Sequence, residues 1–233
     1  MQEEKENKNF LKEIEDMRKA NLAWGCSLSR THPKIREFLL GIKNYISIFD
    51  LKKTNECLTK ALKFIKELTK EKKTILFVGL SIPSKEPIKK TAEKLKFPYI
   101  NESWPGGFLT NFSEIKKRIE YFKNLEKMKE SGQIDSYPIK EKLDLLRDLN
   151  SLKKKFAGVR ELEKLPEAIF LVCSKETQIV INEARRKGIP TIGIVGADFN
   201  PELVDFPIPA NNRSKSAIEF ILNKVEKLLA DKK

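Results

Sequence analysis

Hydrophobic residues along the chain fall into two patterns that alternate. Short apolar runs rich in β-branched and aromatic residues predict strands. These runs are Tyr45–Phe49, Thr74–Leu80, Phe97–Ile100, Ala168–Cys173, Thr191–Val195 and Phe206–Ile208. Because Thr74–Leu80 and Ala168–Cys173 are apolar on successive positions, we expect both of their faces to be covered.

Amphipathic stretches with apolar residues three or four positions apart separate these runs and predict helices. We expect helices over residues 52–72, 84–96, 176–187 and 214–230, with Ser84 as a cap, Pro87 in a first turn and Gly188 after a last turn. Strands that alternate with helices predict an α/β fold in which a mainly parallel sheet is flanked by helices on both sides, of the flavodoxin or Rossmann type.

The middle of the chain has a different pattern. Residues 112–131 and 138–156 each carry one narrow apolar stripe, with Ile139 and Leu143 on the second, and Ser131 and Gly132 interrupt the run between them. Two helices joined by so short a break form an antiparallel hairpin. We therefore expect an α/β domain over residues 21–111 and 161–233, a helical arm inserted at 112–160, and an N-terminal extension or helix at 1–20.

The distribution of charge favours a polyanionic partner. The net charge is +13, yet residues 1–33 and 161–233 each carry equal numbers of basic and acidic groups. The surplus is +6 in residues 34–73, +2 in 74–111 and +5 in 112–160. A cationic surplus confined to one part of a chain is expected of a nucleic-acid binder, although a lysine-rich, solvated surface would give a similar count.

Several protein classes are disfavoured by composition. The three cysteines are far apart and form neither a disulfide framework nor a metal-ligand spacing, which fits a reducing compartment. The longest uncharged run, Thr74–Ser84, has 11 residues, whereas a membrane span needs about 20. The charged N-terminus does not resemble a secretory signal. We expect a cytoplasmic protein with no membrane partner.

No catalytic arrangement is evident. The single histidine, His32, precedes a proline and has no nucleophile motif nearby. Gly79 follows a predicted strand but leads into Pro83, which lacks the N–H that a phosphate-binding loop would use. Asp198 and Asp205 are weak candidates for metal ligands. An enzyme that binds a nucleotide or sugar phosphate is an alternative supported only by analogy of fold.

The segment Trp104–Asn111, with the sequence WPGGFLTN, stands just before the predicted arm. A large aromatic residue, a proline and two successive glycines predict a rigid turn with an accessible backbone. One interpretation is a loop that approaches an RNA backbone closely. The other is that Trp104 anchors the core, since tryptophan is usually mostly buried.

This segment carries a resemblance to a known family. Asn101–Asn111 is similar to the N-H-R-W-L-G-G-x-L-T-N signature of the second protein of the small ribosomal subunit, in its bacterial and organellar form. The resemblance extends over about 21–229 and includes the segments His32–Ile35, Thr74–Gly79, Leu165–Phe170, Glu183–Pro190 and Val204–Asn211. It implies a parallel α/β sheet with a protruding helical hairpin, in contact with small-subunit rRNA and neighbouring ribosomal proteins.

The chain departs from the family pattern at several positions. Ala23–Cys26 replaces the family's H-x-G-H, Ser103 replaces an arginine, and Pro105 replaces a leucine. Carboxylates of the family are missing from Gly196–Pro201 and Asn211–Ser214. We therefore expect neither a metal nor another cofactor.

The resemblance and the charge distribution together imply a structural, non-enzymatic constituent of the small ribosomal subunit that is not a homo-oligomer. A ribosomal paralogue that acts only in protein interactions is a third possibility. The residues expected to bind RNA are Lys34, Arg36, Lys43, Asn44, Trp104, Gly106, Gly107, Asn111, Lys116, Lys117, Arg118, Lys153, Lys154 and Lys155.

Overall fold

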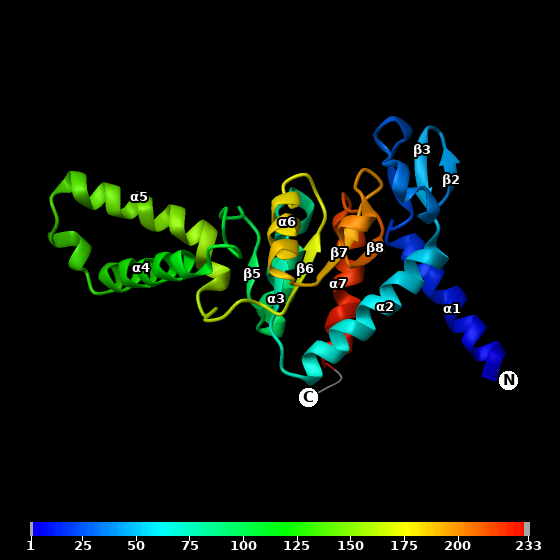
Figure 1. The fold of residues 1–233 in the computed structure, drawn as a ribbon, viewed down its shortest axis with the longest axis horizontal. Helices are drawn as coiled ribbons and strands as arrows, with labels where there is room; N and C mark the ends of the chain where they lie inside the picture. Colours follow the sequence, from blue (N-terminus) through cyan, green and yellow to red (C-terminus); the bar gives the residue numbers. More distant parts are fainter. Residues whose placement is uncertain (1, 231–233) are drawn as a thin grey trace.

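The computed structural model describes residues 2–230, and it places a five-stranded parallel sheet at the centre of the chain (Figure 1). The strand order is β5-β4-β6-β7-β8, and all four pairings are parallel. The strands are β4 (Ile75–Val78), β5 (Tyr99–Ile100), β6 (Ala168–Val172), β7 (Thr191–Val195) and β8 (Phe206–Pro209). The predicted α/β fold class is therefore confirmed.

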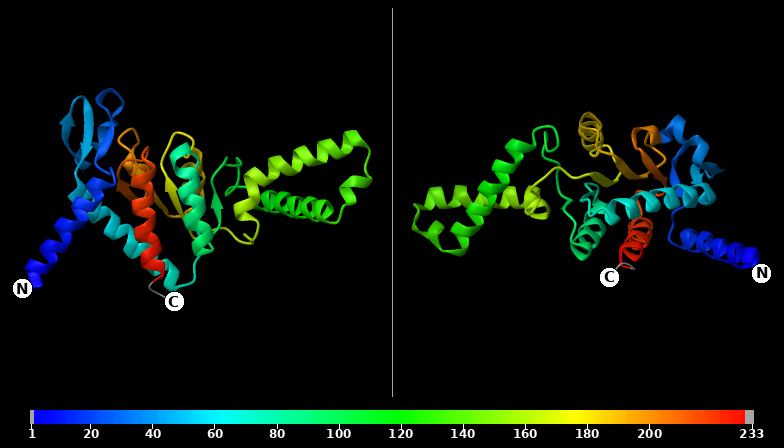
Figure 2. Two further views of the ribbon diagram at one scale, coloured as in Figure 1. Left: turned by 180° about the vertical axis from the view of Figure 1, so that it is seen from behind. Right: turned by 60° about the horizontal axis from the view of Figure 1, so that its bottom comes forward.

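Helices cover both faces of this sheet. The helices outside the arm are α1 (Gln2–Lys19), α2 (Leu51–Lys70), α3 (Ile82–Leu95), α6 (Gln178–Lys187) and α7 (Lys215–Ala230). Helices α2, α3 and α7 lie on one face and α6 lies on the other (Figure 2). Successive residues of the strands alternate between two apolar clusters: Phe77 and Phe170 face the α2–α3–α7 layer, whereas Val78 and Leu171 face α6. This double coverage explains the continuous apolar runs.

One predicted strand belongs to a different sheet. Residues Ile46–Phe49 form β3, which pairs antiparallel with β1 (Trp24–Ser27) and β2 (Leu39–Lys43) in a separate three-stranded sheet. The implied place of this segment in the parallel sheet was wrong, and β1 and β2 were not predicted. Tyr45 lies in the turn between β2 and β3 instead of in the strand. The small sheet stands at the opposite end of the molecule from the arm (Figure 1).

The start of α3 also differs from the prediction. Ser81 is the N-cap residue and Ile82 begins the helix, so Pro83 occupies the first turn and Pro87 lies inside the helix. Ser84, which was expected to cap, is buried and donates its hydroxyl to the carbonyl oxygen of Ser81 at 2.8 Å. A proline suits the first turn, where N–H groups have no partner within the helix, and this preference selects Pro83 over Pro87.

The predicted hairpin is present as an arm that extends away from the sheet (Figures 1 and 2). It consists of α4 (Phe112–Glu130) and α5 (Ile139–Phe156), which run side by side. Ile119 and Phe122 of α4 are buried against the larger of the two clusters. The stripe expected on α5 was partly wrong, because Ile139 and Leu143 are exposed and Leu149 is buried in their place.

The arm returns to the sheet through a close backbone contact. Gly158 follows α5, and a Cβ atom at this position would lie 2.3 Å from the carbonyl oxygen of Tyr99 in β5. Only glycine allows two backbone segments to approach so closely without a shift. The root of the arm, where the chain leaves α5, is therefore held against the edge strand β5 of the parallel sheet.

Candidate nucleic-acid interface

A buried carboxylate organises the WPGGFLTN segment. Glu183 of α6 is 5% exposed, and its two oxygens accept hydrogen bonds from four N–H groups of this loop. The donors are the indole nitrogen of Trp104 at 3.1 Å and the backbone nitrogens of Gly107 at 2.8 Å, Leu109 at 2.9 Å and Thr110 at 3.4 Å. A buried carboxylate is costly unless its oxygens accept hydrogen bonds, and these four donors satisfy both oxygens of Glu183.

Buried side chains of the loop also anchor it to the protein interior. Phe108 and Leu109 are fully buried, and the ring of Trp104 lies 4.9 Å from that of Phe108 between centroids. The structure places Trp104 in this anchor, with its N–H group occupied by Glu183. These contacts with Phe108 and Glu183 fit the interpretation of Trp104 as an anchor of the core.

The two glycines of the loop have different roles. Gly107 has φ of +82°, a conformation that glycine adopts at little cost and other residues rarely adopt. Gly106 has no such constraint, and a Cβ atom there would meet nothing within 4 Å. The turn therefore requires glycine at position 107, whereas position 106 is exposed and open to a partner.

Sequence reasoning assigned no role to Glu183. The only local signal is its position on α6, where it lies among the buried residues Val180, Ile181 and Ala184. A glutamate on the apolar face of a helix is rarely buried without a partner. Such a position indicates a hydrogen-bonded anchor even before its donors are known.

The cationic candidates form two separate groups. Lys34, Arg36, Lys43 and Asn44 lie on or beside the small sheet, whereas Asn111 is the N-cap residue of α4 and the lysines and arginine of α4 and α5 lie on the arm. These two regions are at opposite ends of the molecule (Figure 1). Lys34 is also ion-paired with Glu202. The structure therefore does not bring the fourteen candidates into one continuous site.

Three members of the arm group, Lys153–Lys155, line a lysine-rich hollow. A cavity of about 430 Å³ lies where the end of α5 meets β5, and its lining includes Lys89, Asn101 and Asn150 together with Lys153–Lys155. One carboxylate, that of Glu102, also lines it and is paired with Lys85 at 2.8 Å. Among the side chains that the structure describes, those of residues 10–230, Lys153, Lys154 and Lys155 have no carboxylate partner within ion-pairing distance. Uncompensated lysines beside amide side chains form a surface that suits phosphate groups.

On α4, the three adjacent cations Lys116, Lys117 and Arg118 are exposed. Lys117 forms an ion pair with Glu114 at 2.8 Å, and this contact raises the pKa of its ammonium group. Lys116 and Arg118 have no carboxylate partner in the part of the chain that the structure describes. All three remain in contact with solvent.

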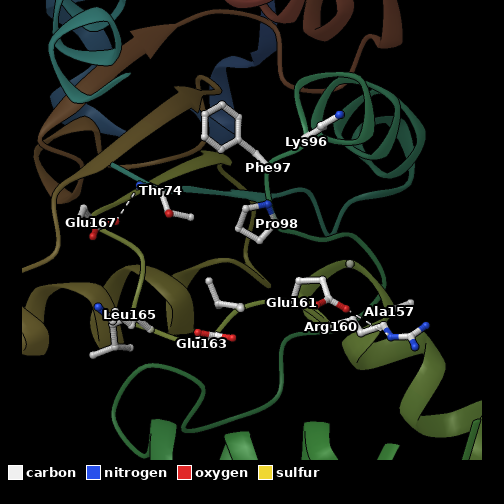
Figure 3. Close-up of a pocket in the computed structure, with 13 residues that line it drawn as sticks. Thr74, Lys96, Phe97, Pro98, Ala157, Arg160, Glu161, Glu163, Leu165 and Glu167 are labelled. Carbon is white, nitrogen blue, oxygen red and sulfur yellow. Dashed lines mark hydrogen bonds and ion pairs between the residues drawn. The ribbon is translucent and has the colours of Figure 1, made fainter. Parts of the chain in front are cut away.

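A second hollow, of about 560 Å³, lies beside the residues that precede three strands (Figure 3). Thr74, Pro98 and Glu167 line it, and they stand at the amino ends of β4, β5 and β6. The backbone N–H of Thr74 donates to Glu167 Oε2 at 2.8 Å. Parallel α/β sheets bind ligands outside the carboxyl ends of their strands, so this hollow is on the side opposite to that expected of an enzyme.

The carboxyl ends of β4 and β7 are filled by the protein itself. A Cβ atom at Gly79 would lie 2.7 Å from Ile88 Cγ1, and one at Gly196 would lie 2.3 Å from Asn212 Oδ1. Both glycines therefore serve close packing of the chain and do not form an open phosphate-binding loop. The geometry gives the nucleotide-enzyme alternative no support at these two strands.

The two aspartates considered for metal binding have other partners. Asp205 accepts hydrogen bonds from the backbone N–H and the hydroxyl of Thr191, each at 2.8 Å, and Asp198 pairs with Arg213 at 2.6 Å. Among the side chains of residues 10–230, which the structure describes, no group of three or more His, Cys, Asp or Glu could hold a metal ion. The same part of the chain contains no helix long and apolar enough to cross a membrane.

Comparisons with known proteins agree with the sequence resemblance. Residues 17–231 match the family model described as Ribosomal protein S2. The small ribosomal subunit protein uS2 of Coprothermobacter proteolyticus is 39% identical over 212 residues, covering 91% of this chain and 79% of that protein. The uS2 proteins of Dictyoglomus thermophilum and Helicobacter hepaticus are 38% and 36% identical, over 91% and 94% of this chain and 86% and 83% of their own. The chain therefore belongs to the ribosomal protein S2 family.

Proposed function

We propose that this chain is a structural constituent of the small ribosomal subunit in the cytoplasm, where it binds small-subunit rRNA and neighbouring ribosomal proteins. The match to the ribosomal protein S2 family over residues 17–231 carries this proposal. The curated relatives are small-subunit proteins of bacteria, and the chain spans most of their length.

The arm supplies the surface that we assign to rRNA. Its exposed cations occur on both helices, and Lys153–Lys155 line the hollow beside β5. Phosphate contacts of this kind position a protein on RNA without reading bases, so recognition depends on the folded shape of the rRNA. The loop anchored by Glu183 immediately precedes α4 and sets the direction in which the arm leaves the sheet.

Replacement of Lys116, Lys117 and Arg118 with Ala tests the arm. Exposed charge changes usually alter stability by less than about 0.5 kcal/mol, so the variant should fold normally. Its association with small subunits should weaken. The logarithmic salt dependence should fall by about 2–3, since each neutralised phosphate contributes about 0.7–0.9 to the slope.

A matched control removes two lysines and one arginine from the part of the chain whose charge is balanced. Lys175, Arg186 and Lys187 are exposed and meet this requirement. Sedimentation with small subunits and filter binding of rRNA between low and moderate salt would compare the two variants. Equal affinity and equal salt slope in both would rule out the arm as the rRNA surface.

A thermal-shift measurement separates this role from the enzyme alternative. A nucleotide present at about 100 times its dissociation constant would stabilise the protein by about 2.7 kcal/mol. We expect no shift with ATP, GTP or NAD. A clear shift would favour the enzyme and would direct attention to the lysine-rich hollow.

A further inference from the structure

The small antiparallel sheet exposes a group of apolar side chains that the proposed rRNA surface does not use. The members of this group, here called the apolar hairpin surface, are Leu28, Leu40 and Ile42, and the exposed Tyr45 follows in the turn after β2. Leu40 and Tyr45 are 74% and 83% exposed, and Leu28, Leu40 and Ile42 line a hollow of about 430 Å³. Large apolar side chains gathered on one surface mark an interaction site more often than scattered ones do.

One strand of this sheet has a free edge. In the order β1-β3-β2, β2 pairs only with β3 among the described residues, and it forms the outer rim of the sheet (Figure 1). The N–H and C=O groups of Leu39–Lys43 that point away from β3 are therefore available. Proteins usually protect such an edge with charges or proline, yet here Lys43 is the one charged residue in the strand.

The turn between β2 and β3 holds Tyr45 in a strained conformation. Asn44 and Tyr45 connect the paired residues Lys43 and Ile46, and their φ values are +50° and +61°. Asparagine tolerates this region, but an aromatic residue adopts it at a cost. The structure thus keeps a strained backbone under a tyrosine that is almost fully exposed, and strain of this kind is typical of functional positions.

The positive charge around this surface favours an acidic partner over a second copy of this chain. Residues 28–46 contain four basic side chains and one acidic side chain. Arg30, Arg36 and Lys43 have no carboxylate partner in the described part of the chain, so the surface attracts acidic groups. A second copy of this chain would bring the same cations to the edge, and like charges across an interface disfavour it.

RNA fits the cations but not the apolar side chains. Leu28, Leu40 and Ile42 are aliphatic and offer no ring on which a base could stack, and Tyr45 is the one exposed aromatic ring within residues 28–46. An extended peptide satisfies both features, because its backbone pairs with β2 while alternate side chains enter the apolar hollow. We propose that the apolar hairpin surface binds an extended segment of a neighbouring protein, rich in acidic and apolar residues, which adds to the small sheet beside β2. This inference rests on the proposed ribosomal role.

Photo-cross-linking in assembled small subunits tests the proposal. A benzoyl-phenylalanine replaces Ile42 in the full chain, and the same replacement at Ile82, which is 88% exposed on α3, is the control. We expect the position 42 probe to cross-link to a net-acidic protein segment, identified by mass spectrometry. Cross-linking to rRNA, to a second copy of this chain or to a net-basic segment would overturn the proposal, as would no product at position 42.

A second variant connects the cross-link to the apolar surface. With the probe at position 42, Leu40→Asp should lower the cross-link yield about tenfold or more, the effect expected of a residue at the centre of an interface. Ile82→Asp should leave the yield unchanged. Equal yields in the two variants would overturn the proposal.

Sedimentation of the same samples measures incorporation into small subunits and so tests the ribosomal role separately. Incorporation into small subunits without a cross-link at position 42 contradicts the docking surface alone. If the unsubstituted chain also fails to incorporate into small subunits, the proposed function is contradicted, and this inference with it.

Discussion

Replacement of Glu183 with Gln should destabilise the WPGGFLTN loop and the root of the arm. Glutamine keeps one acceptor oxygen, but its amide nitrogen is a donor and replaces the other. Two of the four loop N–H groups then face a donor in a buried site. Each buried donor without a partner costs about 1–3 kcal/mol, which gives about 2–6 kcal/mol for two.

The loss of charge offsets part of this cost, because a neutral amide is less expensive to bury than a carboxylate. We therefore expect about 2–4 kcal/mol of destabilisation. For a chain of this size, 1 kcal/mol corresponds to a change in Tm of about 2–4 °C, so Tm should fall by about 5–15 °C. Glu120 is an exposed glutamate of α4, and Glu120→Gln should change Tm by less than about 2 °C.

Two local measurements show whether the loss arises at the loop. Hydrogen exchange at the Gly107 and Leu109 amides should accelerate more than exchange in the strands of the parallel sheet. Trp104 emission should shift to longer wavelength in a Trp24→Phe background, which removes the other tryptophan. If Glu183→Gln matches Glu120→Gln in Tm and the two amides keep their protection, the carboxylate is not the anchor of the loop.

Three further predictions concern backbone and surface contacts. Gly107→Ala should cost about 1–2 kcal/mol in urea unfolding because its φ is positive, whereas Gly106→Ala should be nearly neutral; equal effects would contradict the turn assignment. Gly158→Ala should both destabilise the chain and weaken its association with small subunits, because the added Cβ would collide with Tyr99. An unchanged affinity for small subunits would disprove the importance of this contact. Hydrogen bonds from lysines of α3 and α7 lower the pKa of Glu86 to about 2, so its stabilising contribution is present above its ordinary pKa and declines as the pH falls from about 4.5 towards 2; an NMR titration giving an unshifted pKa would refute this.

The sequence by itself determined the parallel sheet and the arm. Runs such as Ala168–Val172 are buried on every residue, and burial on both faces requires the continuous apolar composition that is visible in the sequence. The hairpin was equally evident, because α4 and α5 contact each other over a short connection and their pairing is local along the chain. In these elements the local pattern and the tertiary environment agree.

Only the tertiary structure decided the small sheet and the loop anchor. The residues of β2 are mostly exposed, so no alternation of apolar and polar positions indicated a strand there, and pairing with β3 defines it. The donors to Glu183 lie 73–79 positions earlier in the chain, and no local pattern relates a helix residue to a loop at that distance. A carboxylate and its donors form an anchor only when the fold brings them together, because each hydrogen bond depends on distance and direction, which hydrophobic periodicity does not encode.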